Sequence, residues 1–211
     1  MGVENYDLYI FDWDGTLTKG KFINKLNEKL NPFWKRWKKA SKYGKINKEK
    51  KFIADTEIFE KNEEKYSLFL DLFVFIYKPK LQKYSRNTLE LLKKRGKKVA
   101  LFSNGAKWRI RRELTHIKIS KYFDIIVSAQ DIGILKPNPY GLNIIAKLLS
   151  INRSRILYVG DMVDDITTAR AAKIDCCAIS DGFDTYEMLK AENPQYLFKT
   201  MEEFYLNLNS A

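Results

Sequence analysis

The chain has 211 residues, which suits either one domain with a substantial insertion or two small domains. Hydrophobic residues make up 45% of it, enough for a packed core, and no stretch approaches the roughly 18 consecutive apolar residues of a membrane-spanning helix. This argues against an integral membrane protein. The N-terminus lacks the basic-then-apolar pattern of a secretion signal, so we expect a soluble, cytoplasmic protein.

The positive charge of the chain is unevenly distributed. The formal net charge is +12, and residues 19–83 hold about eighteen Lys and Arg against about eight Asp and Glu. One interpretation is a solvated surface that keeps the protein soluble. The other is attraction of an anionic substrate, with nucleic acid as a further option.

The first predicted element is a buried strand at residues 8–11, which ends in the segment Asp12-Trp13-Asp14-Gly15-Thr16. Side chains two apart in an extended segment point the same way, so Asp12 and Asp14 are expected to project into one site. Two carboxylates this close need a cation or a shared proton. The alternative is an ordinary turn rich in Asp and Gly.

The next region, residues 19–81, shows no strand-like alternation. Its aromatic and aliphatic residues recur at three and four positions, as in Phe33, Trp34 and Trp37, which is helical spacing. We predict an inserted helical domain at 19–81, with residues 1–18 and 82–211 forming the core.

The remainder alternates helices and strands. Helices are predicted at 86–94, 107–114, 138–149, 165–172, 184–190 and 200–205, and strands at 99–102, 125–127, 156–159 and 176–179. This alternation predicts an α/β fold, a parallel sheet covered by helices on both faces. Ligands of such sheets bind beyond the carboxyl ends of the strands. The adjacent Cys176 and Cys177 have neither disulfide nor zinc-site spacing, so we expect both to be buried.

Three further polar segments follow predicted strands or stiff loops. The turn at 103–105 (Ser-Asn-Gly) offers a hydroxyl and backbone N–H groups to an anion, although a simple helix cap is the alternative. Lys136 in a Pro-stiffened loop offers a fixed positive charge, the alternative being an ordinary solvated lysine. The segment 160–165 places three carboxylates within five residues, and such hard oxygen ligands suit Mg²⁺.

Together these segments resemble a known signature. The order Asp12-Trp13-Asp14-Gly15-Thr16, Ser103, Lys136-Pro137, and Gly160-Asp161 with Asp165 resembles the four motifs of the haloacid dehalogenase superfamily. The insertion after the first motif is similar to that of its phosphoglycolate-phosphatase-like and β-phosphoglucomutase-like branches. The resemblance runs from about Tyr6 to Ala178 and implies a Rossmann-like core, a helical cap and a Mg²⁺-dependent phosphatase acting on a small phosphate monoester.

The resemblance also implies catalytic roles. Asp12 would attack phosphorus and form an aspartyl-phosphate, and Asp14 would protonate the leaving oxygen and then activate water. Lys136 would offset charge on the nucleophile and the phosphate. Ser103 would hydrogen-bond a phosphoryl oxygen, and Asn104 is a further candidate for lining the pocket, with packing as the equal alternative.

The implied metal site combines the first and last motifs. Asp161 would bind Mg²⁺ together with the side chain of Asp12 and the backbone carbonyl of Asp14, while Asp165 would support the metal or steady Lys136. For a phosphate to bridge these groups, Lys136 and Asp161 must lie within about 10 Å of Asp12, a Debye length in ordinary salt.

Several alternatives stay open at this point. A phosphomutase would need the same two aspartates, and a phosphatase of nucleic-acid ends or phosphoproteins would use the basic insertion. A nucleic-acid-binding protein with a vestigial site is a different class, which the intact set of charged residues disfavours. One departure concerns the turn after the helix of the last motif, where related enzymes often have Gly and this chain has Lys173.

Overall fold

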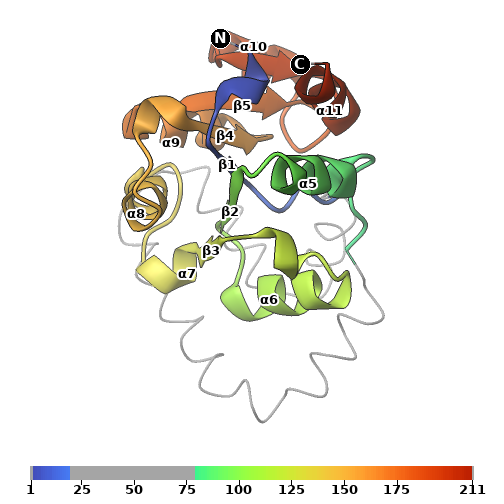
Figure 1. The fold of residues 1–211 in the computed structure, drawn as a ribbon. Coiled ribbons are helices and arrows are strands. Elements are labelled where there is room, and N and C mark those ends of the chain that lie inside the picture. Colours follow the sequence, from blue (N-terminus) through green and yellow to red (C-terminus); the bar gives the residue numbers. More distant parts are fainter. Residues whose placement is uncertain (1, 20–78, 211) are drawn as a thin grey trace, which may run out of the picture.

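A computed structural model describes residues 2–19 and 79–210 of the chain (Figure 1). The predicted helical insertion at 19–81 lies almost entirely outside the described residues, so its fold stays a prediction. Within the described ranges, no helix is both long and apolar enough to cross a membrane.

The core of the structure is a six-stranded sheet in which all neighbouring strands are parallel, in the order β3-β2-β1-β4-β5-β6. The strands are β1 (Leu8–Phe11), β2 (Lys98–Ser103), β3 (Ile125–Ser128), β4 (Ile156–Gly160), β5 (Asp175–Ile179) and β6 (Tyr196–Phe198). After β1 the chain adds β2 and β3 on one side of it, and then β4, β5 and β6 on the other side. The order of strands therefore reverses beside β1, the place where α/β sheets bind ligands.

Helices cover both faces of this sheet (Figure 1). They are α5 (Ser85–Lys94), α6 (Lys107–His116), α7 (Ala129–Ile132), α8 (Tyr140–Leu148), α9 (Val163–Ala172), α10 (Tyr186–Ala191) and α11 (Met201–Asn209). Alternate residues of β1 face opposite cores: Tyr9 and Phe11 pack with α5, α6 and α11, whereas Leu8 and Ile10 pack with α8 and α9. Burial on both faces explains why the strand reads as a continuous apolar run.

The two ends of the predicted insertion lie side by side. The backbone N–H of Lys19 donates to the carbonyl of Lys80 at 2.7 Å, and that of Gln82 donates to the carbonyl of Leu17 at 2.9 Å. The chain thus leaves the core directly after the first motif and returns next to the same place. This pairing is compatible with an insertion at the predicted boundaries.

The α/β architecture predicted from the sequence is confirmed, and each predicted core strand and helix is present within a few residues of its predicted bounds. The two cysteines are free and buried, as expected. One strand and one α-helix of the described residues were missed, besides three 3-10 helices of three residues each. β6 has only three half-buried residues and α7 only four, too few for a periodic pattern to register.

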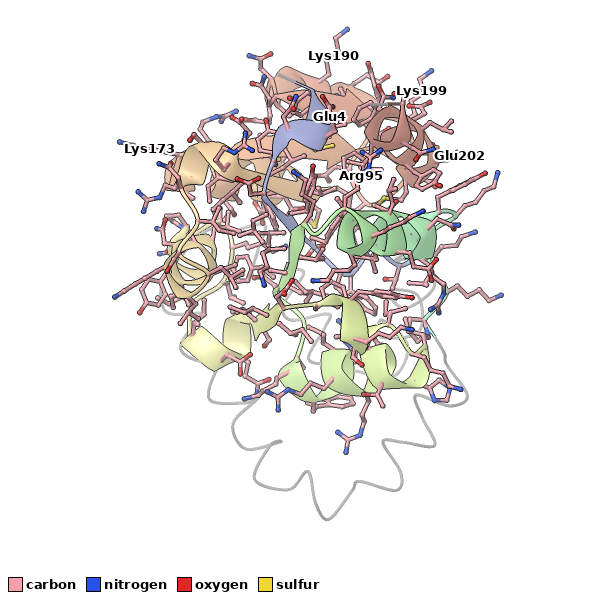
Figure 2. All side chains as sticks on the ribbon, in the orientation of Figure 1. Glu4, Arg95, Lys173, Lys190, Lys199 and Glu202 are labelled. Carbon is pink, nitrogen blue, oxygen red and sulfur yellow. The ribbon has the colours of Figure 1, made fainter. Side chains whose placement is uncertain are left out.

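The turn after α9 has the backbone shape that favours glycine. Lys173 ends that helix with φ of 58°, in the left-handed region, and its exposed side chain lies on the outside of the molecule (Figure 2). A residue with a Cβ is strained in this region, whereas glycine is not. A lysine in this turn is therefore less stable than a glycine would be.

We expect Lys173→Gly to raise the free energy of unfolding by about 0.5–1 kcal/mol, because it removes the left-handed strain while the unfolded chain gains some entropy. Urea unfolding followed by circular dichroism measures the change. Lys147→Gly, inside α8, is the matched control and should lower stability by about 1 kcal/mol. A destabilised Lys173→Gly protein would contradict the interpretation.

Candidate active site

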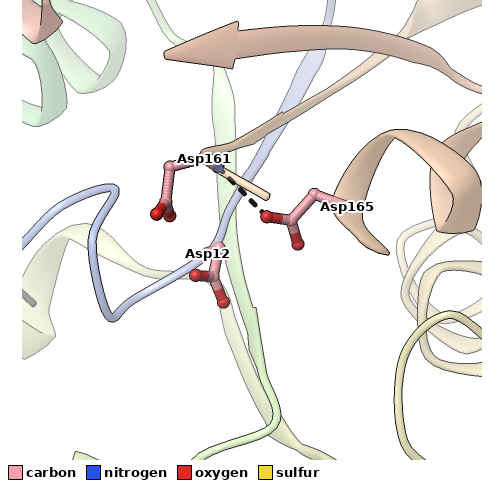
Figure 3. Close-up of side chains that lie close together, drawn as sticks. All are labelled: Asp12, Asp161 and Asp165. Carbon is pink, nitrogen blue, oxygen red and sulfur yellow. Dashed lines mark hydrogen bonds between the residues drawn. The ribbon is translucent and has the colours of Figure 1, made fainter. Parts of the chain in front are cut away.

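Three buried carboxylates meet at the carboxyl ends of the two central strands. Asp12 follows β1, Asp161 follows β4, and Asp165 lies in the first turn of α9 (Figure 3). One carboxylate oxygen from each lies within 4.8 Å of the others, and all three residues are buried. The predicted convergence of the first and last motifs is therefore present.

Lys136 is the positive charge in this cluster. Its Nζ lies 2.7 Å from Oδ1 of Asp12, 2.7 Å from Oδ1 of Asp165 and 3.1 Å from the hydroxyl of Tyr158. These partners account for its three ammonium hydrogens. Lys136 thus lies well inside the predicted 10 Å of Asp12, and the alternative of an ordinary solvated lysine is wrong.

Asp165 is saturated with hydrogen bonds. Its Oδ1 accepts from Lys136 and from the Tyr158 hydroxyl at 2.8 Å, and its Oδ2 accepts from the backbone N–H groups of Asp161 and Met162 at 3.1 and 3.0 Å. Four donors leave this carboxylate little capacity to bind a metal. The arrangement favours the predicted supporting role, in which Asp165 fixes Lys136 and the start of α9.

Tyr158 is a site residue that sequence reasoning missed. It lies in β4, within an apolar run, and its ring is completely buried. A tyrosine in such a strand is typical of core packing, and only the pleat of the strand turns its hydroxyl toward Lys136 and Asp165. The polar end of a buried tyrosine was the one available signal, because such hydroxyls usually have a partner.

Asp161 is held by two donors from separate loops. Its Oδ1 accepts from the Thr16 hydroxyl at 2.6 Å and its Oδ2 from the backbone N–H of Phe183 at 2.8 Å. A Cβ on Gly15 or Gly182 would collide with this carboxylate, and Gly15 also has φ of +96°. Gly15 therefore serves two needs, the turn after Asp14 and the close approach of Asp161.

The charges of the cluster do not balance. If all three carboxylates are ionised, they exceed the one ammonium by two negative charges. Burial raises the pKa of Asp12 to about 7, with Lys136 opposing the shift and Asp165 adding to it. Burial, and then the charges of Asp12 and Asp165, raise the pKa of Asp161 well above its ordinary value. Buried hard oxygen ligands with surplus negative charge fit a divalent cation such as Mg²⁺.

Lys136 keeps its proton in this environment. Burial alone lowers the pKa of a lysine, but the attraction of Asp12 and Asp165 outweighs it, so the pKa of Lys136 lies above its ordinary value. The lysine is therefore a permanent charge beside the Asp12 carboxylate.

The Asp14 side chain takes a different direction from that of Asp12. A turn begins at Trp13, and the Asp14 carboxylate pairs with the guanidinium of Arg109 on α6 instead of joining the cluster. The extended geometry expected for residues 12–14 is therefore not kept. Arg109 also binds Glu113, whose Oε2 accepts from the indole Nε1 of the buried Trp13 at 2.6 Å.

Sequence reasoning missed Arg109 and Glu113 for a physical reason. An Arg and a Glu four positions apart on a helix are typical of a solvated ion pair. Here both side chains are largely buried, with 12% and 5% of their surface exposed.

The phosphate-binding candidates Ser103 and Asn104 lie at the end of β2. The Ser103 hydroxyl oxygen accepts from the backbone N–H of Gly105 at 3.0 Å, which leaves its hydrogen for another acceptor. Asn104 Oδ1 accepts from the backbone N–H of Lys136 at 2.9 Å, so this side chain fixes the loop that carries the lysine. Their roles toward phosphate stay predictions.

Comparison with known proteins agrees with this geometry. The sequence profile of the haloacid dehalogenase-like hydrolases matches residues 9–179. A phosphoglycolate phosphatase of Pseudomonas fluorescens is 33% identical over 110 residues, which are 52% of this chain and 40% of that protein. A candidate pyrophosphatase, PpaX, of Caldanaerobacter subterraneus is 31% identical over 122 residues, 58% of this chain and 56% of that protein. The chain thus matches only about half of the length of these relatives, or less.

A solved structure extends the similarity to the whole fold. A protein from Bacteroides fragilis described as haloacid dehalogenase-like superposes with a TM-score of 0.68 at 25% identity, covering 94% of this chain and 99% of that one. The matched profile spans the first and last motifs, including Asp12 and Asp165. The chain therefore belongs to the family of haloacid dehalogenase-like hydrolases.

Proposed function

We propose that this protein is a Mg²⁺-dependent phosphatase that hydrolyses a small phosphate monoester through an aspartyl-phosphate on Asp12. The observation that carries the proposal is the buried cluster in which Lys136 and Asp161 flank Asp12 at the carboxyl edge of the sheet. Family membership and the names of the relatives support phosphate chemistry.

The residues present fit the implied metal. The side chains of Asp12 and Asp161 and the backbone carbonyl of Asp14 would hold Mg²⁺, which supplies positive charge for the oxygens of the transferring phosphoryl group. Asp165 would support this arrangement through its bonds to Lys136 and to the backbone of Asp161.

The protein groups would divide the reaction into two displacements. Lys136 donates to Oδ1 of Asp12, so it would orient this carboxylate as it attacks phosphorus. As the new O–P bond forms, the bond to the leaving oxygen breaks and Asp14 gives that oxygen a proton. Asp14 then takes a proton from water, which attacks phosphorus and releases inorganic phosphate and free Asp12.

The substrate is proposed only as a class. One relative is named a phosphoglycolate phosphatase and another a candidate pyrophosphatase. These names refer to two different phosphate compounds as substrates. Contacts that select among phosphate esters would come from the predicted insertion, which we propose acts as a lid that excludes water. A screen for phosphate release across phosphorylated metabolites, with Mg²⁺ present, would identify the substrate. A cytoplasmic location is also part of the proposal.

Asp12→Asn is expected to reduce the hydrolysis of p-nitrophenyl phosphate to background, because an amide cannot act as the nucleophile. The fold should survive, since the substitution removes one buried charge. The readouts are phosphate release and the circular dichroism spectrum. Asp7→Asn is a matched control, since this half-exposed carboxylate precedes β1 at the opposite end of the strand and should keep normal turnover. Near-normal hydrolysis by Asp12→Asn would contradict the nucleophile assignment.

Metal dependence has two independent readouts. EDTA is expected to abolish hydrolysis and excess Mg²⁺ to restore it. Mg²⁺ should also raise the Tm of the wild-type protein, because a cation that binds only the folded state stabilises it by about 2.7 kcal/mol at one hundred times its Kd. Asp161→Asn should lose most of this rise. Full activity in EDTA, or an equal Tm rise in Asp161→Asn, would argue against the metal site.

A further inference from the structure

The carboxylate of Asp161 is oriented by two loops from distant parts of the chain. The Thr16 hydroxyl, in the loop after β1, donates to Oδ1 at 2.6 Å, and the backbone N–H of Phe183, in the loop after β5, donates to Oδ2 at 2.8 Å. Both loops also pack directly on the carboxylate, because a Cβ on Gly15 or Gly182 would collide with it. The orientation of Asp161 therefore depends on how these two loops lie relative to each other.

One side chain joins the two loops. The amide nitrogen Nε2 of Gln82 donates to the backbone carbonyl of Asp181 at 2.9 Å and to that of Gly15 at 3.4 Å, the longer and weaker of the two contacts. An amide nitrogen carries two hydrogens, so these contacts use both of them, and only this end of the amide can face two carbonyls. Gln82 therefore bridges the loop after β1 and the loop after β5.

The two bridged carbonyls are close in sequence to the groups that hold Asp161. Thr16 directly follows Gly15, and Phe183 follows Asp181 by two positions. We call residues 15–16 and 181–183 the Asp161 loops. Fixing one carbonyl in each loop also fixes the neighbouring hydroxyl or N–H donor, so the contacts run from Gln82 through both loops to both oxygens of the carboxylate.

The side chain of Gln82 has a single fixed place. The residue is buried, with 6% of its surface exposed, although glutamine is usually found at protein surfaces. Its backbone N–H donates to the carbonyl of Leu17 at 2.9 Å, where the chain re-enters the core after the predicted insertion. Burying an amide is unfavourable unless its polar atoms find partners, and the two loop carbonyls are such partners.

Asp161 keeps capacity for a metal in this arrangement. Each oxygen of an ionised carboxylate has about two acceptor sites. Each oxygen of Asp161 accepts one of the two hydrogen bonds described above, whereas the carboxylate of Asp165 accepts four. Mg²⁺ demands nearly ideal coordination geometry, so the orientation of a ligand carboxylate affects how tightly the ion binds.

We propose that Gln82 is a positioning residue that sets the orientation of the Asp161 carboxylate for a divalent cation by holding the Asp161 loops together. This inference rests on the proposed function, in which Asp161 binds Mg²⁺. Gln82 acts through the donors of Thr16 and Phe183 and contacts neither the metal nor the substrate.

A purely structural role gives a different result. If Gln82 only satisfies two buried carbonyls, its loss lowers stability and leaves the affinity for Mg²⁺ unchanged. If it positions Asp161, its loss also weakens Mg²⁺ binding. Residues that orient metal ligands typically change metal affinity by about 10–100-fold when they are replaced. Gln82 acts through one further group, so we expect the lower end of this range.

The experiment titrates Mg²⁺ into metal-free Gln82→Met protein without substrate and follows the Tm. Methionine is nearly as long as glutamine and has no hydrogen to donate. The Mg²⁺ concentration that produces a given rise in Tm should be about tenfold higher than for the wild type, because the rise depends on the ratio of free Mg²⁺ to its Kd. The Mg²⁺ concentration for half-maximal hydrolysis of p-nitrophenyl phosphate should increase by the same factor, while kcat at saturating Mg²⁺ stays close to that of the wild type.

Ser85→Ala is the matched control. The Ser85 hydroxyl donates to the carbonyl of Leu17 at 2.9 Å, so it makes a buried hydrogen bond near the same re-entry point without contacting the Asp161 loops. Its loss should lower the Tm of the metal-free protein and leave the dependence on Mg²⁺ as in the wild type. Gln82→Asn keeps a polar amide that is one methylene too short to bridge both carbonyls, so it should fold and show a shift in the same direction as Gln82→Met.

The outcomes separate the two proposals. Wild-type dependence on Mg²⁺ in Gln82→Met, or an equal shift in Ser85→Ala, overturns the positioning role while the proposed function stands. If Gln82→Met does not fold, the same comparison with Gln82→Asn decides. A wild-type protein whose Tm and hydrolysis do not respond to Mg²⁺ overturns the proposed metal-dependent function, and this inference with it. A shift of about tenfold in the Gln82 variant with none in Ser85→Ala supports both.

Discussion

The site depends on a shortage of positive charge in a buried place. Asp12, Asp161 and Asp165 come together where water cannot screen them, and Lys136 supplies only one compensating charge. The surrounding structure keeps this arrangement in place. Hydroxyl and backbone donors fix Asp161, four donors saturate Asp165, and glycines at positions 15 and 182 leave room for the carboxylate of Asp161. A cluster of this kind is costly in an empty state and gains stability from a divalent cation, which is why the metal and the nucleophile belong to the same proposal.

Two cations divide four of the five carboxylates near the site into separate pairs. Lys136 joins Asp12 to Asp165, and Arg109 joins Asp14 to Glu113. Each cation comes from a different part of the chain than the carboxylates of the first motif. The division keeps Asp12 and Asp14 apart although only Trp13 separates them in sequence. The nucleophile and the proton donor that we propose would need different surroundings, and the two pairs differ in this way.

The topology of the sheet explains why the site lies at this edge. β1 is central, the strand order reverses beside it, and the chain leaves the core within a few residues of Asp14. The segments in which the chain leaves and re-enters the core, near Lys19 and Lys80, pair with each other next to the first motif. Any segment inserted there begins and ends at the rim of the site. This placement is compatible with the lid that we propose for the predicted insertion.

The sequence by itself determined all the strands but β6 and all the α-helices of the core but α7, together with their order and the positions of the acidic motifs. Continuous apolar runs such as 8–11 and 156–159 predict buried parallel strands, and polar residues directly after them fall at one edge because parallel strands share an orientation. Asp12 and Asp161 could therefore be brought together before the structure was known, whereas the place of Lys136 was implied by the resemblance to the haloacid dehalogenase motifs. Only the tertiary structure decided that Asp14 turns to Arg109, that the Tyr158 hydroxyl meets Lys136, and that Asn104 fixes the backbone of that lysine. These contacts join residues that are far apart in the chain, and they depend on turn dihedrals and side-chain rotamers, which local periodicity does not encode.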